Sequence, residues 1–115
     1  MKRAGLVKIL NLMGVLMMVT VIIMALPLTV PKLLGYQIYA VLTGSMEPTY
    51  PVGSVVYVKE AVPTEIQVGD AITFSMGENA EYVMTHRVVE ILTDTQAFVT
   101  KGDANNAEDA EPVLF

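Results

Sequence analysis

In residues 9–31, ILNLMGVLMMVTVIIMALPLTVP, no side chain is charged. At a rise of about 1.5 Å per residue, a helix of this length crosses a hydrocarbon layer of about 30 Å. A cleaved secretory signal is the alternative, but the apolar part of such a signal usually has only about 7 to 15 residues. The sequence therefore predicts a transmembrane anchor over residues 9–31.

Charge is distributed unevenly around this segment. Three basic residues precede it, Lys32 follows it, and all 12 acidic residues lie farther along the chain. Because basic flanks stay on the cytoplasmic side, we expect a single-pass membrane protein with a cytoplasmic N-terminus, residues 1–8, and an extracytoplasmic domain, residues 32–115. The acidic domain has too few basic residues to neutralise phosphates, so nucleic acid is not an expected partner.

After the anchor, the residue pattern changes from one typical of a helix to one typical of extended strands. Five segments rich in β-branched and aromatic residues predict strands at 36–43, 54–59, 70–76, 82–92 and 95–101. Turn-forming residues separate them, namely the Gly- and Pro-rich stretch 44–53, Pro63, Gly69, Gly77-Glu78-Asn79 and Thr93-Asp94. We expect a mainly β fold, in which an N-terminal transmembrane helix precedes a small antiparallel β domain.

The residues available for metal or redox chemistry are few. The chain has no cysteine and a single histidine, which excludes a thiolate nucleophile, a disulfide framework and the usual zinc sites. The polar loop 101–109 offers oxygen ligands for calcium, but Glu108 stands where an EF-hand loop needs glycine. We therefore predict no metal and no cofactor.

Three polar segments carry residues suited to nucleophilic catalysis. Ser45 follows a predicted strand at a turn, and His86 lies in the middle of another strand. An imidazole with an ordinary pKa of about 6.5 accepts a serine proton near neutral pH, and either Asp103 or Asp109 could orient it. Taken singly, a turn serine, a strand histidine and a solvated acidic loop are more often structural.

These segments, in this order, resemble the conserved boxes of type I signal peptidases. The nucleophile box is Gly44-Ser45-Met46-Glu47-Pro48-Thr49, the base box is Thr85-His86-Arg87, and the aspartate box runs from Lys101-Gly102-Asp103 to Asp109. The resemblance is to the Ser-His branch, known from the endoplasmic reticulum, archaea and some Gram-positive bacteria. The other branch has a lysine base where His86 stands.

The resemblance implies a signal-peptidase-like fold and a serine endopeptidase that removes signal peptides from membrane-inserted preproteins through an acyl-enzyme. It implies Ser45 as nucleophile, His86 as general base and roles for both aspartates. We favour Asp109 as the partner of the imidazole and Asp103 as the residue that shapes the loop, although the sequence does not decide between them. Thr43 is either a second oxyanion-hole donor beside the Ser45 N–H or an ordinary strand residue.

One departure from the family concerns the C-terminus. The chain stops at Pro112-Val113-Leu114-Phe115, where family members usually continue into further strands, so we expect a truncated domain. The alternative function is then a non-catalytic, membrane-tethered β module or an accessory subunit of a peptidase complex. A self-cleaving repressor is excluded because the apolar span stands where its DNA-binding region would be. The oligomeric state and the set of preproteins are not predicted.

Overall fold

The computed structural model describes residues 2–76 and 82–115. The turn predicted at Gly77-Glu78-Asn79 lies outside the described residues. The chain divides into two compact units, residues 1–38 and residues 39–115, and each is described by itself.

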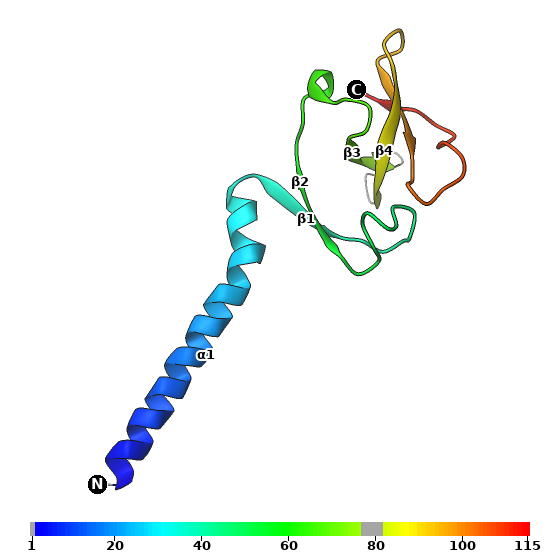
Figure 1. Ribbon diagram of the computed structural model, residues 1–115. Coiled ribbons are helices and arrows are strands. Elements are labelled where there is room, and N and C mark those ends of the chain that lie inside the picture. Colours follow the sequence, from blue (N-terminus) through cyan, green and yellow to red (C-terminus); the bar gives the residue numbers. More distant parts are fainter. Residues whose placement is uncertain (1, 77–81) are drawn as a thin grey trace. The chain divides into compact units, whose positions relative to one another are not determined.

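The first unit consists mainly of a single helix, α1, which spans Lys2–Leu33 without interruption (Figure 1). It contains the predicted apolar span and continues beyond it at both ends, because lysine, arginine and leucine are good helix formers. Its most apolar 18-residue window has a mean hydropathy of 2.6, and none of its side chains is buried. By length and composition, α1 can cross a membrane.

Two threonine hydroxyls of α1 are paired within the helix. The hydroxyl of Thr20 donates to the carbonyl of Leu16 at 2.8 Å, and that of Thr29 donates to the carbonyl of Ala25 at 2.9 Å. Such internal pairing suits a helix in hydrocarbon, where water cannot replace a missing partner. The chain leaves the helix at Gly35, whose φ of +89° favours glycine.

The second unit is built from strands and loops. β1 (Tyr36–Ala40), which begins before the division between the units, and β2 (Val55–Lys59) form a two-stranded sheet. A four-stranded antiparallel sheet contains, in chain order, β3 (Ala71–Met76), β4 (Tyr82–Leu92), β5 (Ala97–Lys101) and β6 (Val113–Leu114). A single 3-10 turn, Pro63–Glu65, lies between β2 and β3 in the chain. The predicted mainly β fold with an N-terminal apolar helix is confirmed.

The strand ends differ from the predictions by a few residues. The prediction for β4 was correct at both ends, whereas β1 ends at Ala40 and not at residue 43. β5 begins at Ala97 and not at residue 95, because the preceding turn puts Gln96 at a φ of +51°. β6 and the 3-10 turn were not predicted.

Most of the buried residues on β4 and β5 share one face of the sheet. Val88 is fully buried and is the register partner of Thr100, which is also fully buried. The other buried apolar side chains are Met46, Ala97 and Phe98, and the ring of Phe98 stacks on that of Phe115 with centroids 4.5 Å apart. Because Met46 belongs to the loop between β1 and β2, this small core packs that loop against the sheet.

Candidate active site

Ser45 lies in the loop between β1 and β2, and its main chain is fixed by the loop that follows β5. The Ser45 carbonyl accepts the Ala104 N–H at 2.9 Å. The next side chain, Met46, is 3% exposed, and its sulfur accepts the Asp103 N–H at 3.4 Å. The nucleophile candidate and the aspartate loop are thus joined by backbone contacts, although 57 residues separate Met46 from Asp103.

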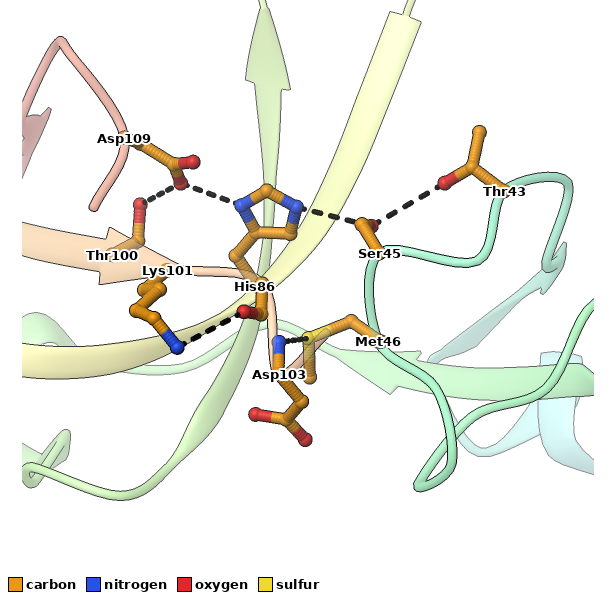
Figure 2. Close-up of polar contacts among 9 residues, drawn as sticks. Thr43, Ser45, Met46, His86, Thr100, Lys101, Asp103 and Asp109 are labelled. Carbon is orange, nitrogen blue, oxygen red and sulfur yellow. Dashed lines mark hydrogen bonds and ion pairs between the residues drawn. The ribbon is translucent and has the colours of Figure 1, made fainter. Parts of the chain in front are cut away.

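His86 lies on β4 and its side chain is 3% exposed. Strand residues two apart face the same side, so His86 shares the buried face of β4 with Val88. The ring of Phe74 on β3 packs edge-on against the imidazole, with centroids 6.5 Å apart. Figure 2 shows the imidazole between Ser45 and Asp109, with Nε2 of His86 3.1 Å from Oγ of Ser45.

Asp109 holds the opposite side of the imidazole. Its Oδ2 lies 2.5 Å from Nδ1 of His86 and also accepts the Thr100 hydroxyl at 2.6 Å (Figure 2). A carboxylate only accepts hydrogen bonds, so Nδ1 of His86 carries the proton and Nε2 keeps a lone pair. We assign the Ser45 hydroxyl as the donor to that lone pair, which is the protonation pattern of a serine nucleophile beside a general base.

Asp103 faces a guanidinium instead of the imidazole. Its carboxylate forms a two-point ion pair with Arg87, with Nε–Oδ1 and Nη2–Oδ2 distances of 2.7 Å. The hydroxyl of Thr49 donates to the same carboxylate at 2.8 Å, and Arg87 also donates to the Gly69 carbonyl at 2.7 Å. The hydrogen bond from Arg87 lowers the pKa of Asp103 to about 2, and the same hydrogen bond raises the pKa of Arg87. Asp103 therefore links β4 to the Ser45 loop.

Gly102 marks the closest approach between the two loops. It is buried, and a Cβ atom added there would lie 2.6 Å from the Ser45 carbonyl oxygen and 2.7 Å from Nδ2 of Asn105. Contacts that short are prohibited, and one of the two atoms belongs to the main chain. Glycine at this position allows the aspartate loop to reach the Ser45 loop.

A groove of about 710 Å³ opens beside the Ser45 and His86 side chains. The exposed hydroxyl of Thr43 lies 3.3 Å from Oγ of Ser45 and also borders this groove. Most of the remaining lining is apolar and includes Val41, Leu42, Met46, Val56, Val83 and Met84.

The five residues predicted for the site occupy two neighbouring clusters. Ser45, His86 and Asp109 form one continuous chain of hydrogen bonds, with Thr43 beside Ser45, whereas Asp103 belongs to the Arg87 ion pair. Within residues 2–76 and 82–115, no three His, Cys, Asp or Glu side chains gather in a way that could hold a metal ion.

The sequence analysis assigned no role to Arg87, Thr49 or Thr100, although each contacts one of the two aspartates. Two of the three carried a signal in the sequence. Arg87 directly follows the only histidine, and Thr100 occupies a strand position whose neighbour at 98 is a core phenylalanine on the same face.

Comparison with known proteins agrees with this arrangement of segments. The family model described as signal peptidase, peptidase S26, matches residues 10–97. The chain belongs to the signal peptidase family. Signal peptidase I W of Bacillus subtilis (strain 168) is 45% identical over 86 residues, which cover 72% of this chain and 44% of that protein. No solved structure gives a significant match.

The family match has defined limits. Ser45 and His86 lie within the matched residues, whereas Asp103 and Asp109 lie beyond residue 97. The chain also spans less than half of the length of the curated relative.

Proposed function

We propose that this chain is a membrane-anchored serine endopeptidase that removes N-terminal signal peptides from secreted preproteins. The observation that carries the proposal is the continuous contact from Ser45 through His86 to Asp109, with distances of 3.1 and 2.5 Å. The three side chains come from a loop, a strand and a second loop, so their meeting is a property of the tertiary fold. Membership of the signal peptidase family supplies the substrate class.

In the proposed reaction, Oγ of Ser45 attacks the scissile carbonyl carbon while Nε2 of His86 takes the hydroxyl proton. The carboxylate of Asp109 keeps the proton on Nδ1 and stabilises the imidazolium. His86 then gives its proton to the leaving amine as the C–N bond breaks, which leaves an acyl-enzyme on Ser45. A water molecule that loses its proton to His86 hydrolyses the ester and restores the Ser45 hydroxyl.

The negative charge on the carbonyl oxygen needs hydrogen-bond donors. The Ser45 N–H and the Thr43 hydroxyl are the proposed pair, supported by the position of Thr43 on the groove beside Oγ of Ser45. Loss of one such donor raises an acyl-transfer barrier by about 2.7 to 4 kcal/mol in a well-studied protease. The apolar groove lining suits a substrate segment with small apolar residues before the cut.

The proposed function also assigns each segment of the chain a position relative to the membrane. Residues 1–8 are the cytoplasmic N-terminus, residues 9–31 span the bilayer, and residues 32–115 form the extracytoplasmic catalytic domain. The length and apolar character of α1 support the anchor, and the basic residues before the span support the orientation. Asp103 has a structural role, supported by its ion pair with Arg87.

The test is cleavage of a preprotein in detergent or in vesicles, with small residues before its cut site. Ser45→Ala and His86→Ala should each reduce the rate by about 10³-fold or more, because nucleophile and base act as a unit. Ser75→Ala is the matched control, since it makes the same chemical change at an exposed position on β3 and should leave the rate unchanged.

Two results would contradict the proposal. Full cleavage by Ser45→Ala would exclude this serine as the nucleophile. A folded wild-type chain that cleaves no preprotein but still binds one would support the alternative of a non-catalytic, membrane-tethered β module.

A further inference from the structure

Thr100 is a buried polar residue on β5 for which the proposed reaction has no direct use. It is fully buried and pairs in register with Val88, two residues along β4 from His86. Diagonal neighbours on one face of a sheet lie about 7 to 8 Å apart, and the Thr100 hydroxyl donates to Asp109 and not to the imidazole. The carboxylate of Asp109 occupies the space between them.

Thr100 holds Asp109 at two points. Its hydroxyl donates to Oδ2 of Asp109 at 2.6 Å, and its carbonyl accepts the Asp109 N–H at 2.8 Å. The carboxylate oxygen that accepts the Thr100 hydroxyl is the same one that faces Nδ1 of His86. The contact with the Thr100 carbonyl therefore fixes the main chain of Asp109, and the contact with the Thr100 hydroxyl fixes the rotation of its carboxylate.

We infer that Thr100 is a positioning residue, whose hydroxyl orients the Asp109 carboxylate so that His86 keeps its Nδ1–H tautomer. The inference rests on the proposed function and extends it to a residue that does not touch the substrate. Without the hydroxyl, the contact left to the carboxylate among the described residues is the one with His86, and the group is free to turn about its last side-chain bond. Because Thr100 is fully buried, valine at this position leaves no room for a water molecule to replace the lost donor.

Two pairs of residues at position 100 separate the hydroxyl from the side-chain volume. Threonine and valine have nearly the same shape and differ in the hydroxyl, whereas serine keeps the hydroxyl without the methyl group and alanine has neither. The experiment compares wild type, Thr100→Val, Thr100→Ser and Thr100→Ala as full chains in detergent micelles. Circular dichroism and thermal unfolding of each variant verify the fold.

The first measurement is the imidazole NMR spectrum. His86 is the only histidine, so each imidazole signal is assigned without ambiguity. Wild type and Thr100→Ser should show a single Nδ1–H tautomer in the neutral ring. Thr100→Val and Thr100→Ala should show a mixture of the two tautomers.

The second measurement is preprotein cleavage. Removal of the hydroxyl should lower kcat by about tenfold with KM changed by less than about twofold, because a hydrogen bond to a charged group is lost and no substrate contact changes. Thr100→Ser should cleave at close to the wild-type rate. If Thr100→Val does not fold, the comparison of Thr100→Ser with Thr100→Ala tests the role of the hydroxyl.

The outcomes for the inference and for the proposed function are distinct. Equal spectra and equal rates in variants with and without the hydroxyl would overturn the inference, as would equal losses in Thr100→Ser and Thr100→Ala. Cleavage retained by Ser45→Ala would overturn the proposed function, whereas the imidazole spectra would still decide whether Thr100 orients Asp109.

Discussion

The two aspartates of the last loop differ in the hydrogen-bond donor that each faces. Asp109 lies against Nδ1 of His86, and Asp103 lies against the guanidinium of Arg87, the next residue along β4. Successive strand residues point to opposite faces, so His86 and Arg87 present their side chains on the two sides of β4. The loop brings one carboxylate to each side, which explains how residues six apart in one loop serve separate contacts.

Gly102 gives a prediction at the residue scale. Gly102→Ala should lower the free energy of unfolding by about 1 to 3 kcal/mol, because the added Cβ overlaps the Ser45 carbonyl and the loops must separate. It should also reduce cleavage, since the same carbonyl belongs to the proposed nucleophile. Chemical unfolding of the full chain and the preprotein assay measure the two effects.

Gly44→Ala is the control for this substitution. Its added Cβ would meet only the end of the Glu47 side chain, at 3.4 Å, so its stability should stay close to that of the wild type. Equal stability of the two alanine variants would show that the contact between the loops is not tight.

At the scale of elements, the sequence predicted the helix and the strands that a local residue pattern indicates. β4 was predicted at both ends because its β-branched run is long, and α1 was found from its apolar residues although the helix is longer than the apolar span. β6 was missed because a two-residue strand has no periodicity and exists only through its pairing with β5. The start of β5 depends on a left-handed residue, Gln96, which no local pattern indicated.

The same reasoning explains what was predictable of the site. Ser45, His86 and the two aspartates were identified because their residue types and order match a known chemistry. Assigning a contact to each aspartate needed the register of β4 and β5, which places Arg87 opposite Lys101 and Val88 opposite Thr100. That register is a long-range property, so the sequence could not choose between Asp103 and Asp109.

The ion pair between β4 and the loop after β5 predicts a pH dependence of stability. The pKa of Asp103 is lowered from 3.8 to about 2 in the folded protein, mainly by the hydrogen bond from Arg87. A lowered pKa contributes stability that is fully present above pH 3.8 and is lost as the pH falls from about 3.8 to about 2. Wild type should therefore lose stability over this interval relative to Asp103→Asn, which has no proton to gain.

The measurement is the difference in unfolding free energy between wild type and Asp103→Asn from pH 6 down to about pH 2. Asp94→Asn makes the same change in an exposed turn, and its difference from wild type should not vary in the same way. A difference for Asp103→Asn that stays constant below pH 3.8 would contradict the assigned ion pair.

At the scale of the whole molecule, the proposed orientation predicts which end is accessible from outside the cell. A reporter fused after Phe115 should be digested when intact cells are treated with protease, because the acidic β unit is placed on the extracytoplasmic side. The same reporter fused before Met1 should be protected. Digestion of the N-terminal reporter with protection of the C-terminal one would reverse the topology.

The residues of the proposed site are also synthesised in a fixed order. Ser45 precedes His86 by 41 residues, and His86 precedes Asp109 by a further 23. A ribosome makes the chain from its N-terminus, so in the proposed orientation the serine reaches the far side of the membrane well before the carboxylate that completes the hydrogen-bonded chain. In the proposed function, a peptidase made among nascent proteins with exposed signal peptides therefore stays incomplete during its own translocation, and the proposed active site forms only when residue 109 has emerged.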